Sequence, residues 1–179
     1  MKNVFMLDAH IKTLDVSFLY DDKEFSSYYS QMPDYRKKKI DFFKFKKDKC
    51  LSLGAGILMN QLILYAKKQS SSLNDDSFTV DFSKNGKPFF KFLPFLNFSL
   101  AHSGKMVIAA LSTKKIGVDV EEETDESEID FKTWTKAESY IKALDLPLSD
   151  YIEGKIPLPP ENSFRQWTEN GYIFCVYED

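Results

Sequence analysis

The sequence predicts an α+β protein, and three observations lead to this fold class. A helical pattern fills most of residues 22–68, short strand-like runs follow the serine-rich linker at 70–77, and a second helical pattern occupies 131–144. A strong hairpin signal, Asn170-Gly171, lies near the carboxyl end. The 179 residues suit one domain or two small lobes that share a core.

The first part of the chain is expected to start with strands and continue with helices. Residues 2–7 and 12–20 mix apolar and polar side chains in short runs, as strands do. A helical pattern begins at Asp22, and Pro33 suits the first turn of a new helix. A longer helix is expected from about 45 to 68.

The second part is richer in strands. The expected strands are 78–82, 96–100, 106–112 and 116–121, with a turn at Asn85-Gly86. After the helix at 131–144, prolines at 157, 159 and 160 mark a loop, and strands at 163–168 and 172–177 complete the chain.

Composition narrows the class of protein. The chain is 43% hydrophobic and 15% aromatic, which is enough apolar surface for a sizeable core. No apolar run reaches the ~20 residues that span a bilayer and no secretory signal opens the chain, so we expect a cytoplasmic protein. Cys50 and Cys175 are too few for a disulfide framework or a zinc site, and we expect two buried thiols.

Charge is unevenly distributed along the chain. The net charge is −3, which argues against a general nucleic-acid binder. Residues 36–49 read RKKKIDFFKFKKDK, whereas residues 119–130 read DVEEETDESEID. The first run is suited to an anion and the second to a cation, although each on its own is also typical of a solvated face. A polyanion binder acting through 36–49 is one hypothesis that this pattern allows.

Asp119 and Glu121 are candidate metal ligands. In a strand they share one face, with Cα atoms about 6.6 Å apart, while Val118 and Val120 face the core. Mg2+ takes oxygen ligands and often needs only one or two carboxylates beside phosphates and water. An acidic strand end without a metal is the simpler alternative.

Two further segments carry chemically useful side chains. Trp134, Glu138 and Lys142 follow one another at intervals of four and lie on one helical face. Glu138 is suited to bind a metal or accept a proton and Lys142 to bind a phosphate, although a surface ion pair has the same spacing. His102 and Ser103 occupy a small-residue turn after a strand, where both can reach a phosphate, although a lone histidine is often structural.

Taken in order, these segments resemble the 4'-phosphopantetheinyl transferases of the surfactin-synthetase-activating type. The matching stretches are 98–104, 116–121 and 134–143, and supporting matches are 86–88, 52–56 and the basic run after Pro33. The resemblance covers roughly residues 33–142.

The resemblance implies a pseudo-dimer of two α/β lobes with antiparallel sheets, residues 1–104 and 105–179, forming one compact unit. It implies Mg2+-dependent transfer of 4'-phosphopantetheine from coenzyme A to a serine of an acyl or peptidyl carrier protein, in fatty acid, polyketide or nonribosomal peptide biosynthesis. Coenzyme A and the apo carrier protein are then the expected partners, with no nucleic acid and no membrane, and a monomer is expected because the second lobe supplies the pseudo-partner.

Positions carry over from the family as follows. Asp119, Glu121 and Glu138 would coordinate Mg2+, and Glu138 would also be the base for the serine hydroxyl. Lys142 would steady the pyrophosphate or protonate the departing 3',5'-ADP. The nucleotide phosphates would be held by basic and small polar residues: Lys87, His102, Ser103, and one or two of Arg36, Lys37 and Lys38.

The chain departs from the family pattern at several positions. Ala137 stands where a lysine usually precedes the metal-binding glutamate, Ala101 replaces a serine, and Leu51 replaces a basic residue. Only residues 122–133 separate the acidic strand from the next helix, where relatives have a longer segment near the carrier surface. These differences predict altered carrier recognition, or alternatively a weakened or inactive homologue that binds coenzyme A or a carrier protein.

Overall fold

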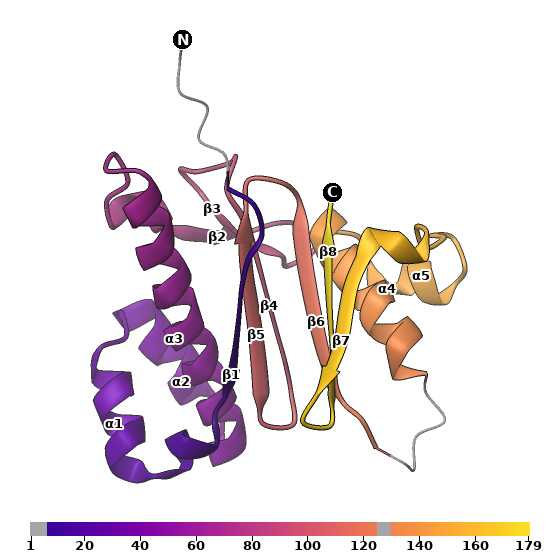
Figure 1. Cartoon of the computed structure of the whole chain (residues 1–179). Helices are drawn as coiled ribbons and strands as arrows, with labels where there is room; N and C mark the ends of the chain where they lie inside the picture. Colours follow the sequence, from indigo (N-terminus) through magenta and orange to yellow (C-terminus); the bar gives the residue numbers. More distant parts are fainter. Residues whose placement is uncertain (1–6, 125–129) are drawn as a thin grey trace.

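A computed structural model describes residues 7–124 and 130–179 (Figure 1). The helices are α1 (Asp22–Ser30), α2 (Asp34–Phe42), α3 (Lys46–Gln69), α4 (Phe131–Leu144) and α5 (Leu148–Ile152). The strands are β1 (His10–Asp15), β2 (Val80–Phe82), β3 (Pro88–Phe90), β4 (Asn97–Ser103), β5 (Met106–Ser112), β6 (Ile116–Glu122), β7 (Phe164–Glu169) and β8 (Tyr172–Glu178). The α+β fold class is confirmed; the strand expected at 2–7 falls almost entirely outside the described residues.

Two three-stranded antiparallel sheets form the centre of the molecule. Their strand orders are β1-β5-β4 and β6-β8-β7, and β2 and β3 form a separate two-stranded ribbon. Leaving the short elements aside, β1-α3-β4-β5 and β6-α4-β7-β8 have the same β-α-β-β connectivity, with the third strand between the first two in both sheets. The chain therefore consists of two lobes with the same arrangement, as expected.

The boundary between the lobes needs correction. A division after residue 104 would cut the β4–β5 hairpin, in which Ser103 pairs with Met106. Because β5 lies between β1 and β4, it belongs to the first sheet, and the second sheet starts with β6 at Ile116. The connection at 113–115 thus separates the lobes.

Two hydrophobic cores hold the helices and sheets together. In the first, Val107, Ala109 and Leu111 of β5 pack with α3. In the second, the alternate residues of β5 pack against Val118 and Val120 of β6. The two faces of β5 thus serve different cores, so the lobes form one compact unit, and α4 covers the outer face of the second sheet.

Helix α3 has the length and apolar composition of a membrane-spanning segment. No such segment was expected from the sequence, because no uninterrupted apolar run is long enough. Its most apolar 18-residue stretch is 67% buried inside the protein. Such burial is what a core helix needs, and Gly54 lets it approach β1 and β5 closely, because an added Cβ would meet Val16, Val107 and Leu14.

Two expected elements differ in detail. Residues 17–20, expected in a strand, form a 3-10 helix because Val16 and Leu19 are both fully buried, a spacing of three that a strand's period of two does not allow. Strand β3 was not expected; it is three residues long and starts with a proline. The helix at 131–144 is confirmed. The hairpin around Asn170 and Gly171 is confirmed as well, and both of these turn residues have positive φ.

Serine hydroxyls connect the two sheets where β4 runs beside β6. The Ser99 hydroxyl accepts the Val118 N–H at 3.1 Å, and the Ser103 hydroxyl accepts the Glu122 N–H at 3.2 Å. Residues four apart on β4 thus bind residues four apart on β6, which aligns the two strands in parallel and fixes the position of β6 relative to the first lobe.

Candidate active site

The candidate active site begins with the close approach of α4 to β6. A Cβ added to Gly117 would overlap the backbone oxygen of Ser139 and lie 2.5 Å from the Ala143 nitrogen. The absence of a side chain at Gly117 therefore lets the helix backbone rest directly on the strand. Ala137 and Ala143 are buried at this contact side of the helix.

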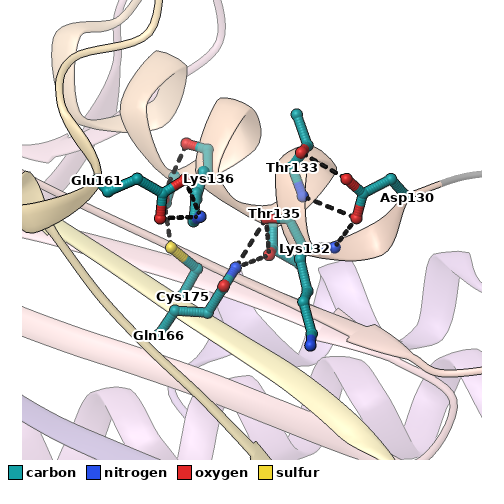
Figure 2. Close-up of polar contacts among 9 residues, drawn as sticks. Asp130, Lys132, Thr133, Thr135, Lys136, Glu161, Gln166 and Cys175 are labelled. Carbon is teal, nitrogen blue, oxygen red and sulfur yellow. Dashed lines mark hydrogen bonds and ion pairs between the residues drawn. The ribbon is translucent and has the colours of Figure 1, made fainter.

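The amino-terminal half of α4 is fixed by polar contacts (Figure 2). The Asp130 carboxylate caps the helix by accepting the Lys132 N–H at 3.0 Å. The Gln166 side chain of β7 donates to the Lys132 oxygen at 2.7 Å and to the Thr135 hydroxyl at 2.9 Å, as Figure 2 shows. Lys136 forms an ion pair with Glu161 at 2.6 Å. These contacts set the rotation of α4 about its axis.

That rotation brings Glu138 and Lys142 to Asp119. The Lys142 ammonium lies 2.6 Å from Oδ1 of Asp119 and 3.3 Å from Oε2 of Glu138. The Asp119 side chain is 5% exposed, and its Oδ2 is buried without a hydrogen-bond partner among the described residues. The strand and helix residues that the sequence singled out thus form one cluster, with the ammonium between the two carboxylates.

Burial dominates the electrostatics of Asp119. It raises the pKa of the Asp119 carboxyl to about 7; Lys142 opposes this shift, and Glu138 and Glu121 reinforce it. For Lys142, burial lowers the pKa, but the two carboxylates outweigh it and the net shift is upward. Lys142 is therefore an ammonium that pairs with two carboxyl groups, those of Asp119 and Glu138, and the Asp119 carboxyl is poorly solvated.

Glu121 and Ser103 bind each other instead of pointing to a shared ligand. The Ser103 hydroxyl donates to Oε2 of Glu121 at 2.8 Å while accepting the Glu122 N–H. As they stand, no three carboxylate, imidazole or thiol groups converge to hold a metal ion in the described residues 7–124 and 130–179. The charge of Glu121 contributes to the raised pKa of Asp119.

Two adjoining cavities lie beside this cluster. The smaller, about 240 Å³, lies between the β2–β3 hairpin and β4 on one side and α4 with the residues that follow it on the other, and Lys142 lines it. The larger, about 560 Å³, extends between α2, α3 and the β2–β3 ribbon to His102. Four residues line both cavities: Gly86, Pro88, Phe98 and Leu100. Together the cavities form one groove, called the interlobe groove below because its smaller part lies between the lobes, while the larger part is lined by residues of the first lobe.

The larger cavity contains a set of polar groups suited to an anion. Arg36 donates to the Ser52 backbone oxygen at 2.5 Å, whereas its Nε and the Ser52 hydroxyl are buried without partners among the described residues. A Cβ at Gly56 would lie 3.2 Å from that Nε, so the glycine leaves room for the guanidinium. Lys39 also lines the cavity, and burial, followed by the charge of Arg36, lowers its pKa.

His102 lines the larger cavity and is exposed to solvent. Surrounding protein atoms lower its pKa by desolvation, and the charge of Lys142 lowers it further. The imidazole is thus disposed to be neutral in the absence of an anion.

Lys37 and Lys38 do not line either cavity among the described residues. Lys37 lies 5.8 Å from the centre of the Tyr29 ring and Lys38 is exposed. Lys39 takes the place beside Arg36 because residues three apart share a helical face. The spacing of three from Arg36 could have identified Lys39, which was missed. No pattern in the sequence marked Ser52 individually as a cavity residue.

Lys87 lies at the smaller cavity but its ammonium is occupied. It donates to the Ala143 backbone oxygen of α4 at 2.8 Å. Burial lowers its pKa and Asp145 partly offsets that effect.

Comparison with known proteins supports one class. No family model matches the chain. Over 65 residues the chain is 29% identical to a 4'-phosphopantetheinyl transferase of Bacillus subtilis, a stretch that covers 36% of this chain and 29% of that protein. This similarity supports the phosphopantetheinyl transferase family, and with it a transferase, without distinguishing the surfactin-synthetase-activating type.

Proposed function

We propose that this chain transfers 4'-phosphopantetheine from coenzyme A to a serine of an acyl or peptidyl carrier protein. The observation that carries the proposal is the cluster of Asp119, Glu138 and Lys142 at one end of the interlobe groove. The other end of the groove holds Arg36, whose Nε is buried without a partner among the described residues. Acids at one end and anion-binding groups at the other suit a ligand that carries both a diphosphate and a further phosphate. The partial similarity to a phosphopantetheinyl transferase favours the same reaction.

The donor set fits Mg2+ in its chemistry. The buried Oδ2 of Asp119 has no described partner, and carboxylate oxygens are ligands that Mg2+ prefers. Asp119, Glu121 and Glu138 are the residues that would hold the ion, which when bound would supply charge neutralisation beside a diphosphate. The Lys142 ammonium, which now balances Asp119 and Glu138, would then be free to turn toward the groove that it lines.

In the proposed reaction the serine oxygen bonds to the phosphorus that carries the pantetheine arm, and the bond from that phosphorus to the 3',5'-ADP oxygen breaks. Glu138, which is 17% exposed, accepts the proton of the serine hydroxyl. Lys142 stabilises the charge that develops on the departing 3',5'-ADP. Arg36, Lys39 and His102 bind the remaining phosphate and hold the nucleotide in the larger cavity.

The test is incubation with coenzyme A, Mg2+ and an apo carrier protein, followed by intact-mass measurement of the carrier. We expect a mass gain equal to the phosphopantetheine arm, lost in Glu138→Gln and retained in Glu153→Gln, an exposed acid outside the site. No mass gain with any of several carriers, including the organism's own, would end the proposal.

A weakened or inactive homologue that binds coenzyme A or a carrier protein is the second candidate. It is favoured by Ala137 and Ala101 and by the use of the Ser103 hydroxyl inside the protein. Calorimetry separates the two candidates, because this one gives coenzyme A binding without transfer.

A further inference from the structure

The loop between β2 and β3, residues 83–87, binds the carboxyl end of α4 at three points. Ser83 donates to Oδ1 of Asp145 at 2.9 Å, Asn85 donates to the Asp145 backbone oxygen at 2.6 Å, and Lys87 donates to the Ala143 backbone oxygen at 2.8 Å. The loop belongs to the first lobe and α4 to the second. These hydrogen bonds therefore span the groove at its smaller cavity, which the loop lines.

The helix end is a place that needs such partners. The last four carbonyls of an α-helix have no intrahelical donor, and the helix dipole favours a cation beside them. Asp145 adopts the left-handed conformation, with φ 56°, and ends the helix directly after Leu144. Lys87 thus supplies both a donor and a positive charge to the terminal turn.

The loop itself is preorganised for this contact. The Ser83 N–H donates to the Lys87 oxygen at 2.8 Å, and the Ser83 hydroxyl accepts the Lys87 N–H at 3.0 Å. Gly86, with φ 86°, closes the turn. Ser83 therefore holds both ends of the loop while it binds Asp145.

Lys142 is the residue next to Ala143, so the loop acts one residue away from the ammonium that binds Asp119 and Glu138. We propose that the loop 83–87 is a positioning element that sets the place of Lys142, and that Lys87 acts on the α4 backbone rather than on a ligand phosphate. The catalytic part of this inference rests on the proposed function; the structural part does not.

Hydrogen exchange of the ligand-free protein tests the structural part. Lys87→Met keeps the length of the side chain without its donor, and we expect amides of residues 141–146 to exchange about tenfold faster. Lys84→Met, an exposed lysine in the same loop, is the matched control and is expected to leave exchange unchanged. Lys87→Arg retains a donor and is expected to restore much of the protection. Unchanged exchange in Lys87→Met overturns the proposal.

Steady-state kinetics test the catalytic part. A positioning role predicts that Lys87→Met and Ser83→Ala each lower kcat by about tenfold, with KM for coenzyme A within about twofold of the wild-type value. A phosphate-binding role predicts instead a raised KM in Lys87→Met alone, and that result would overturn the proposal. If the wild-type chain shows no transfer, the proposed function fails, while the exchange data still decide whether the loop positions α4.

Discussion

Lys142 forms ion pairs with a strand acid and a helix acid at once, 2.6 Å from Asp119 and 3.3 Å from Glu138. Lys142 only partly offsets the cost of burying the Asp119 carboxylate, because the second oxygen, Oδ2, is buried without a partner among the described residues. This is why the pKa of the Asp119 carboxyl rises to about 7 despite the adjacent ammonium.

The raised pKa of Asp119 predicts an unusual dependence of stability on pH. Its pKa is about 7 in the folded protein against an ordinary 3.8, so the folded state holds a proton that the unfolded chain releases. The contribution of this group is fully present below about pH 4 and is lost as the pH rises through 7. Asp119→Asn should flatten this loss and raise the free energy of unfolding at pH 8 by about 1–3 kcal/mol.

Urea denaturation between pH 5 and 8, with EDTA present, measures this effect. Asp8→Asn, at an exposed position, is the control and should follow the wild-type curve. If Asp119→Asn lowers the free energy of unfolding at pH 8, the ion pair with Lys142 outweighs the burial of the Asp119 carboxylate, and the prediction is wrong.

Gly117→Ala should strongly destabilise the protein. The new methyl group would overlap the Ser139 backbone, which can move only if α4 lifts from β6, and a cost of about 2–4 kcal/mol is expected. Gly54→Ala meets methyl groups of the Val16 and Val107 side chains and no backbone atom, so it should cost less than Gly117→Ala. Chemical denaturation compares the two variants; equal costs would contradict direct backbone packing at Gly117.

Ser103→Ala should affect the junction between the lobes and not the binding of coenzyme A. It removes the hydrogen bond to Glu121 and leaves the Glu122 N–H without its acceptor, at a cost of about 1–2 kcal/mol. Ser99→Ala removes the equivalent acceptor for Val118 and serves as the comparison. Calorimetry with coenzyme A completes the test, and a large loss of affinity in Ser103→Ala would show that the hydroxyl turns to the ligand.

Arg36→Met should weaken coenzyme A binding by about tenfold or more, because it removes a charged donor from the larger cavity. Lys38→Met makes the same change of charge on the same helix outside the cavity and should leave the affinity nearly unchanged. Titration calorimetry at two salt concentrations measures both variants. Equal losses would instead favour a diffuse polyanion surface along residues 36–49.

Much of the acidic cluster was predictable from local spacing. The period of two in β6 places Val118 and Val120 in the hydrophobic core that β6 shares with β5, and it leaves Asp119 on the face toward α4. The interval of four between Glu138 and Lys142 likewise appears as an ion pair. Such rules work here because each concerns a single regular element.

Contacts between distant segments were not predictable in the same way. Lys87 binds a backbone oxygen 56 residues away, and Ser103 binds a carboxylate 18 residues away. Both partners depend on how the lobes meet, which no local pattern encodes. The basic run was different. Lys39 shares the helical face of Arg36, whereas Lys37 and Lys38 are turned about 100° and 200° away, so the helical period alone could have pointed to Lys39 instead of Lys37 and Lys38.

Because β5 and β6 share one hydrophobic core, neither lobe buries all of its apolar side chains on its own. Chain cleavage within residues 113–115 would uncover Ile108 and Ala110 on one fragment and Val118 and Val120 on the other. Each separated fragment would then expose an apolar surface. The fragments are therefore expected to aggregate when produced separately and to reassemble when co-expressed. This makes the 113–115 connection a natural place to build a split-protein reporter.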